Sequence, residues 1–180
     1  TAPEFHLAAC LGNLDVVKSF VEKGIDVDTK DEIGWSPLYW AASMGQEEIA
    51  EFLISKGAAI DVETSNNRTL LHQAARSCAS ILVKLLISKD TDVNARDKNN
   101  NTPLHSAATG GNTNIVALLI DNGADINAHN NKSLTPLHFA AKVGHKDVVE
   151  LLIVNGADIN AQNRRGMTAL HLVARGGQKE

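Results

Sequence analysis

The stretch Thr135-Pro136-Leu137-His138-Phe139-Ala140-Ala141 decides the fold, because the chain repeats it at a fixed interval. Close copies begin at Ser36, Thr69, Thr102 and Thr168, each 33 residues from the next. Residues 3–9 continue the same register at the N-terminal end of the sequence. A period between about 20 and 50 residues predicts a stacked repeat architecture, in which each copy buries its apolar face against its neighbours.

One unit, residues 130–162, shows the pattern within the period. Thr135 is a suitable N-cap and Pro136 suits the first position of a short helix. Gly144 is expected to end that helix in the left-handed conformation. A second helix is expected from about residue 145 to residue 154, because its apolar residues recur at helical spacing. An extended segment and a polar loop tip complete the unit, so the predicted order is helix, turn, helix, loop.

This pattern resembles the ankyrin repeat family, in which a Thr-Pro-Leu-His-x-Ala motif recurs every 33 residues. The resemblance covers almost the whole chain and implies an all-α ankyrin repeat solenoid of helix-turn-helix units joined by hairpin loops. In such arrays the first helices and the hairpin tips line a concave face. We expect a single domain over residues 1–180 with about six units: 1–30, 31–63, 64–96, 97–129, 130–162 and a partial unit 163–180.

Both terminal units are expected to be incomplete, since the last one stops after its first helix. Repeat arrays need terminal units with a polar outer face. The chain is therefore expected to be a piece of a longer protein, or to be capped by another element.

The third unit, residues 64–96, departs most from the motif. Leu70 replaces the proline, Cys78 replaces the glycine between the helices, and Asp90 replaces the glycine after the second helix. Aspartate tolerates the left-handed conformation better than most residues, whereas cysteine adopts it poorly. We expect this unit to be the least stable part of the stack. In the second unit, Tyr39 replaces the histidine and Trp40 follows it.

Five histidines recur once per unit and do not have the spacing of metal ligands, which cluster about two to five residues apart in zinc sites. The resemblance implies that this column of imidazoles bridges the backbone of a hairpin loop and a helix. The column is His6, His72, His105, His138 and His171. His129 and His145 lie outside it, and we expect both to be solvated.

The Asp-x-Asn pairs, such as Asp125 and Asn127, lack the further acidic ligands and central glycine of a calcium-binding loop. They are expected to form hydrogen bonds between neighbouring loops. The family resemblance also implies that Asn94, Asn127 and Asn160 match positions that an asparagine hydroxylase modifies in ankyrin proteins.

Catalysis is not indicated, because the sequence has no phosphate-binding glycine loop and no nucleophile elbow. No metal and no cofactor is predicted, and the chain is not expected to be an enzyme. Cys10 and Cys78 lie two units apart, roughly 20 Å if packed helices are about 8–10 Å apart, and a disulfide requires Cα atoms within about 7 Å. Reduced cysteines are typical of a cytoplasmic or nuclear protein. No apolar run approaches the roughly 18 residues of a membrane span.

The columns that the fold leaves free are the loop tips, the residue before the Thr or Ser cap, and the last two residues of each first helix. Interface hot spots favour Trp, Tyr and Arg, so we predict that these columns bind a partner, with Trp35 and Met44 as apolar anchors. The alternative for Trp35 is that it folds over its own hairpin. The predicted partner-binding residues are Trp35, Ile33, Met44, Arg68, Arg76, Lys98, Leu134, Lys142, Val143, Arg164, Arg165, Met167 and Arg175.

These free columns are basic from Arg68 onward, although the chain as a whole has a net charge of −4. They carry Arg68, Arg76, Lys98, Lys132, Lys142, Arg164, Arg165 and Arg175 without an acidic residue among them. Such a face would attract an acidic segment of a protein or peptide. Nucleic acid is the competing partner, but its binding sites usually add stacking aromatics, and this half of the chain has only Phe139.

The function predicted from the sequence is a monomeric, non-catalytic protein–protein interaction scaffold that binds a protein or peptide on its concave face. Membrane insertion and nucleic-acid binding are not predicted. Two alternatives stay open. One is the targeting or substrate-recognition arm of a larger enzyme, effector or toxin whose activity lies outside this chain. The other is an engineered repeat-protein binder, which the differences among the unit frameworks disfavour.

Overall fold

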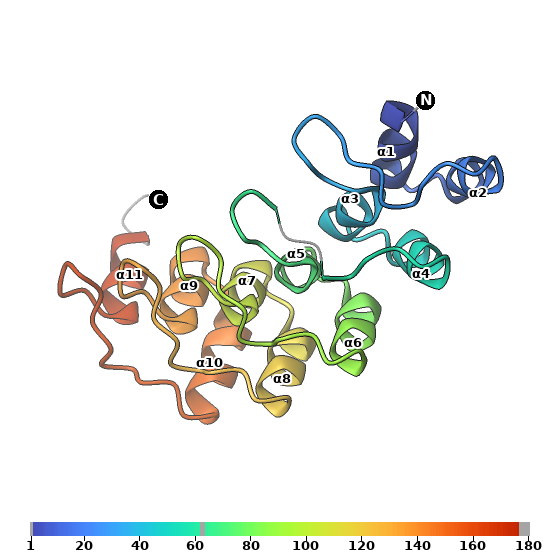
Figure 1. Cartoon of the computed structure of the whole chain (residues 1–180). Coiled ribbons are helices and arrows are strands. Elements are labelled where there is room, and N and C mark those ends of the chain that lie inside the picture. The colour runs from blue at the N-terminus through green and yellow to red at the C-terminus, as the bar shows by residue number, and fades with distance from the viewer. Residues whose placement is uncertain (1, 62–63, 177–180) are drawn as a thin grey trace. The chain divides into compact units, whose positions relative to one another are not determined.

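The computed structural model describes residues 2–61 and 64–176, with side chains described as far as residue 174. Its described residues form eleven α-helices and no β-strand. The helices are α1 (Ala2–Leu11), α2 (Leu14–Glu22), α3 (Pro37–Ser43), α4 (Glu47–Ser55), α5 (Leu70–Arg76), α6 (Ser80–Ser88), α7 (Pro103–Gly110), α8 (Thr113–Asp121), α9 (Pro136–Val143), α10 (Lys146–Val154) and α11 (Ala169–Gly176). This order confirms the all-α repeat fold (Figure 1).

Ten of these helices form five consecutive pairs, from α1 and α2 to α9 and α10, and α11 begins a further repeat. The expected count of about six repeats was therefore too high, since the described residues hold five complete helix pairs. The first repeat, which we expected to be incomplete, has both of its helices.

The chain divides into two compact halves of several repeats each. From here on, unit 1 means the half Thr1–Thr91 and unit 2 the half Asp92–Glu180, and a single copy of the motif is called a repeat. In unit 1 the first helices α1, α3 and α5 pack in succession, and α2, α4 and α6 form a second layer behind them. In unit 2 the helices α7, α9 and α11 form the first layer, with α8 and α10 behind. The expectation of one domain over residues 1–180 stays a prediction.

The start of each first helix follows from the repeated motif. Thr69, Thr102 and Thr135 are N-caps whose side chains accept a backbone N–H one turn into the helix, and the histidine at that position bonds back to the cap. Proline occupies the first helical turn of α7 and α9. The cap and the proline both leave fewer unsatisfied N–H groups at the helix start.

The turns between helices require the left-handed conformation that the glycine columns predicted. Gly111 and Gly144 end α7 and α9 with φ of 86° and 91°. Cys78 and Asp90, which replace glycine in the third repeat, adopt the same conformation with φ of 61° and 58°. A side chain in this region costs free energy that glycine avoids, so the third repeat carries local backbone strain.

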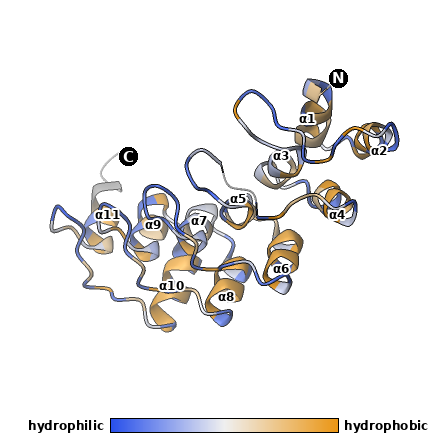
Figure 2. Ribbon diagram, viewed as in Figure 1, coloured by the Kyte–Doolittle hydropathy of each residue, from blue (hydrophilic) through white to orange (hydrophobic). Residues whose placement is uncertain are grey.

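In the first helices from α1 to α9, the core consists of the residue at the leucine position of the motif and the paired alanines, and all of these are buried. Leu170, at the same position in α11, is 75% exposed. Figure 2 shows the consequence, because the second-layer helices α6 and α10 are largely apolar while the loops of unit 2 are largely polar. No helix in the described chain has the length and apolar character to span a membrane. The helices therefore supply most of the buried apolar side chains, and loop alanines such as Ala124 and Ala128 add to them.

Candidate interaction surface

The buried histidines of unit 2 are part of the scaffold. Nδ1 of His105 accepts the backbone N–H of Thr102 at 3.1 Å, and Nε2 lies 3.0 Å from the carbonyl oxygen of Leu134 in the next repeat. Because a ring nitrogen that accepts an N–H carries no proton, Nε2 must be the donor to that carbonyl. His138 repeats this arrangement with Thr135 and Met167. The predicted bridging role of the histidine column is confirmed at these two positions.

Burial also sets the protonation of His138. Loss of solvent lowers the pKa of His138 below its usual value, and this outweighs the opposing effect of its hydrogen bond to the Met167 carbonyl. The neutral imidazole is the form that this hydrogen-bonding geometry requires.

Tyr39 occupies the histidine position of the second repeat and links the next loop by other means. Its hydroxyl is hydrogen-bonded to the side chains of Thr64 and Arg68. Burial raises the pKa of Tyr39, although the positive charge of Arg68 opposes this rise. Arg68, a predicted partner-binding residue, is half-buried beside this tyrosine.

Each loop tip is shaped by a side chain that the sequence analysis did not single out. Asp97 Oδ1 accepts the backbone N–H groups of Asn99 and Asn101 at 2.8 and 2.9 Å, and the Asp97 N–H donates to the carbonyl of Asn101. The same bonds recur at Asp31, Thr64, Asn130 and Asn163. These positions are 33 residues apart, so the repeat period could have revealed them. The second and third residues of each tip are exposed.

The tips of unit 2 are bonded to one another. Asn131 N–H donates to the Asn99 carbonyl at 2.9 Å, and Arg164 N–H donates to the Lys132 carbonyl at 3.1 Å. The side chain of Asn100 donates to Asn131 Oδ1 at 2.8 Å. The three tips of this unit therefore form a continuous hydrogen-bonded row.

The Asp-x-Asn pairs join the loops at the opposite end of the extended segments. Asn94 donates through Nδ2 to the Gly123 carbonyl, and its Oδ1 accepts the N–H of Asp125. Asn127 makes the equivalent bonds to Gly156 and Asp158. The expected bonding between neighbouring loops is confirmed.

Four cations project from the tips of unit 2, and we call Lys98, Lys132, Arg164 and Arg165 the basic tip row. All four side chains are exposed. None of them makes a hydrogen bond or an ion pair with another described residue. The carboxylate closest in sequence, Asp97, is buried and occupied by N–H donors of its own tip. The row is therefore a set of available positive charges.

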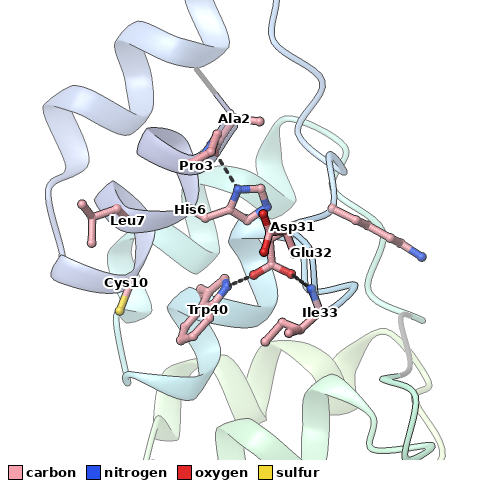
Figure 3. A pocket seen from close by; sticks show the side chains of 10 residues that line it. Ala2, Pro3, His6, Leu7, Cys10, Asp31, Glu32, Ile33 and Trp40 are labelled. Carbon is pink, nitrogen blue, oxygen red and sulfur yellow. Dashed lines mark hydrogen bonds between the residues drawn. The ribbon is translucent and has the colours of Figure 1, made fainter.

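Unit 1 has a different surface feature, an open apolar groove of about 500 Å³ between α1 and the tip of the next repeat (Figure 3). Leu7 and Ile33, which line it, have 55% and 57% of their side chains exposed. The groove is lined by Ala2, Pro3, His6, Leu7, Cys10, Lys30, Asp31, Glu32, Ile33 and Trp40. Of the predicted binding residues, only Ile33 belongs to this set.

The carboxylate of Asp31 is fixed at one side of this groove. It accepts the indole N–H of Trp40 at 2.7 Å and the backbone N–H of Ile33 at 3.1 Å (Figure 3). The backbone N–H of Trp35 also donates to it, at 2.8 Å. Burial raises the pKa of Asp31, but these hydrogen bonds outweigh burial and the pKa lies below its usual value. Asp31 is therefore a charged side chain that three hydrogen bonds hold in one orientation at the side of the groove.

Trp35 is half-buried, and its ring packs against Tyr39 and Trp40 with centroid distances of 4.6 and 4.7 Å. The geometry matches the alternative in which Trp35 folds over its own hairpin, and its binding role stays a prediction. Met44 and Val143 extend from helix ends with about half of each side chain exposed. Their exposure leaves both side chains open to a partner.

The other predicted residues occupy two environments. Arg76 and Lys142 are exposed in the last turns of α5 and α9. Leu134 and Met167 are half-buried, and their carbonyls accept hydrogen bonds from His105 and His138. The side chain of Arg175 lies outside the described residues.

His145 was expected to be solvated, and that prediction is wrong. It is half-buried, and its Nε2 donates to the Thr109 carbonyl of the preceding repeat at 3.0 Å. Gln46, at the equivalent place in unit 1, donates to the Cys10 carbonyl at 3.3 Å. The start of a second helix thus reaches back to the end of the preceding first helix, a link that is visible only when both repeats are placed.

Within the described residues, no three His, Cys, Asp or Glu side chains gather in a way that could hold a metal ion. The features that remain are stacked helix pairs, buried hydrogen-bonding columns and exposed tips. They define the chain as a helical repeat protein with an exposed loop-and-helix-end surface.

The particular family follows from comparison with known families. A family model described as ankyrin repeats (three copies) matches residues 5–97 and again residues 71–163. The chain belongs to the ankyrin repeat family. A search of curated proteins found no match. Ankyrin repeats are in general modules for protein–protein interaction and are typically non-catalytic, which gives the class of function expected for the exposed surface.

Proposed function

We propose that the chain is a non-catalytic scaffold that binds a protein or peptide with an acidic segment on the concave face of its repeats. The observation that carries the proposal is the basic tip row, whose exposed cations have no partner among the described residues. The scaffold columns, in contrast, are buried and hydrogen-bonded. Exposed charges that the fold does not use are available for long-range attraction of an oppositely charged partner.

Unit 1 is proposed to offer apolar contacts of its own. Ile33 and Met44 present exposed apolar surface, and the groove beside Ile33 offers a concave place for a side chain of the partner. Arg76, Lys142 and Arg175 are proposed to select charge from the helix ends. Cys10 and Cys78 are not joined in a disulfide, which fits a reducing compartment, so we propose that this activity belongs to the cytoplasm or nucleus.

A protein partner fits unit 2 better than a nucleic acid. Binding of single-stranded nucleic acid relies on aromatic side chains that stack on the bases. Phe139 is the one Phe, Tyr or Trp in the sequence of this unit, and its ring packs edge-on against His105 at 5.2 Å. Unit 2 therefore lacks an aromatic platform for bases.

Selection from a random peptide library displayed on phage tests the proposal. We expect enrichment of peptides rich in Asp and Glu, and loss of their binding when Lys98, Lys132 and Lys142 are each changed to Glu in one variant. The matched control reverses Lys146 in the same unit, an exposed lysine at the start of α10 rather than on a tip. Failure to enrich acidic peptides, or equal binding to the triple variant, would reject the proposed function.

A further inference from the structure

The backbone bonds between the tips of unit 2 fix the spacing of the basic tip row as well as its charge. The bonded residues include those that carry the cations. The Lys98 carbonyl accepts the side-chain N–H of Asn131 at 3.0 Å, and the Lys132 carbonyl accepts the N–H of Arg164. The backbone that carries these side chains is therefore held in place, while the charged ends of the side chains make no such bonds with other described residues.

The spacing follows from the packing of the first helices. Each tip of unit 2 precedes a first helix, and α7, α9 and α11 pack in succession. Packed helices lie about 8–10 Å apart, so one repeat advances the row by about 10 Å. An extended peptide advances about 3.3 Å per residue, so three residues span one tip.

We propose that unit 2 binds an extended peptide segment that carries three acidic residues, each three positions from the next. Lys98 meets the first acid, Lys132 the second, and Arg164 with Arg165 the third. The inference rests on the proposed function and adds the spacing of the charges that the partner must present. The polarity of the peptide along the row is left free, because each contact is made by a side chain.

The row is a property of unit 2 and not of the repeat in general. The equivalent tip positions in unit 1 are Glu32 and Ile33 in one repeat, and Ser65 and Asn66 in the next. No cation stands at any of these four positions. The same scaffold therefore supplies an internal comparison, in which the tips persist and the basic residues are absent.

Fluorescence anisotropy with three labelled nine-residue peptides tests the spacing. All contain Gly and Ser, and the first has Glu at positions 1, 4 and 7. The second has the same composition with its three Glu residues adjacent, and the third has Gln in place of Glu. At about 50 mM salt, where exposed charges are weakly screened, we expect the spaced peptide to bind about 3-fold or more tighter than the clustered one. The Gln peptide should not bind measurably.

Variants connect the preference to the row. Lys132→Glu removes the central cation and should reduce the advantage of the spaced peptide to less than about 1.5-fold, whereas Lys146→Glu should leave it unchanged. Circular dichroism of both variants checks that the helices are retained. Loss of the preference in both variants would overturn the assignment to the row.

The outcomes separate the two levels of the argument. Equal binding of the spaced and clustered peptides would overturn the spacing and leave the acidic-partner function in place. Absence of binding to either acidic peptide would overturn the spacing together with the acidic-partner function. Tighter binding of a single-stranded oligonucleotide than of the spaced peptide would assign the row to nucleic acid and overturn the inference.

Discussion

Units 1 and 2 are built from the same repeat but differ in charge and in how their loops are held. Unit 1 has 8 Lys and Arg against 13 Asp and Glu, a net charge of −5, whereas unit 2 has 9 against 8, a net charge of +1. Unit 2 keeps His105 and His138, together with the glycines that end α7 and α9. Unit 1 replaces them with Tyr39 in one repeat and Cys78 in another. The regular unit holds its tips in a bonded row, and the irregular unit opens an apolar groove.

The difference shows that the hydrogen-bonding positions and the variable tip positions are separate columns of the repeat. Tyr39 still reaches the next loop through Thr64 and Arg68, so the link survives a change of side chain. The tip residues change from Glu32 and Ile33 to Lys98 and Asn99 without a change in tip geometry. A partner can therefore be specified at the tips while the stack stays intact.

The largest expected effect comes from removing a bridging histidine of unit 2. His138→Ala deletes the bonds to Thr135 and to the Met167 carbonyl and leaves buried polar groups unsatisfied, which should lower the free energy of unfolding by about 3 kcal/mol. Tyr39→Phe in unit 1 removes one hydroxyl and should cost about 1–2 kcal/mol. Urea denaturation measures both changes, with exposed His129→Ala as the control. An equal cost at all three positions would contradict the scaffold role.

The proposed apolar anchors of unit 1, Trp35 and Met44, should give the next largest effect, on affinity rather than stability. Met44→Ala together with Trp35→Ala should weaken a selected peptide by about 10-fold or more, since each hot spot contributes about 2 kcal/mol. Trp35 also packs on Tyr39 and Trp40, so the single variant Met44→Ala separates binding from folding. Ile81→Ala on α6 is the matched control, with a side chain of similar exposure. Unchanged affinity in Met44→Ala would remove this residue from the site.

The 33-residue period predicted most of the fold because the fold itself is periodic. Caps, first-turn prolines, left-handed glycines and buried leucines all have local causes, so one unit read from the sequence describes the others. The histidine bridges and the loop-to-loop bonds of Asn94 and Asn127 followed in the same way. The count of complete repeats did not, because the motif marks only the first helix of each pair.

The surface was less predictable because it depends on which repeats face one another. The exposed cations could be assigned from the repeat register. The backbone hydrogen bonds between neighbouring tips became visible only in the structure. The groove combines Leu7 and Trp40 from helices with Ile33 from a loop, a combination that no local pattern contains. The prediction that His145 is solvated was wrong for the same reason, because its hydrogen-bond partner is a carbonyl in the preceding repeat.

A smaller effect should come from relieving the strain in the third repeat. Cys78→Gly places glycine at a φ of 61° and should stabilise the chain by about 1 kcal/mol. Gly144→Ala makes the reverse change in unit 2, where nothing lies within 4 Å of the added carbon, and should cost a similar amount. Amide hydrogen exchange measures the local effect, with faster exchange expected in residues 64–96 than in residues 130–162. Equal protection of the two segments would contradict the strain argument.

Acid should produce the smallest effect, in a different pH window for each unit. The lowered pKa of His138 means that below its unfolded value of 6.5 the unfolded chain binds a proton more readily than the folded one. Its contribution to stability is thus present above about pH 6.5 and falls as the pH drops toward the folded pKa. The lowered pKa of Asp31 has its effect below the unfolded value of 3.8, where protonation removes stability that is present at higher pH. Urea denaturation at pH 7.5, 6.5 and 5.5 should show a loss of stability as the pH falls. His138→Gln should reduce this loss, and Asp31→Asn should leave it unchanged. The opposite pattern would reverse the assignment of the two pH windows.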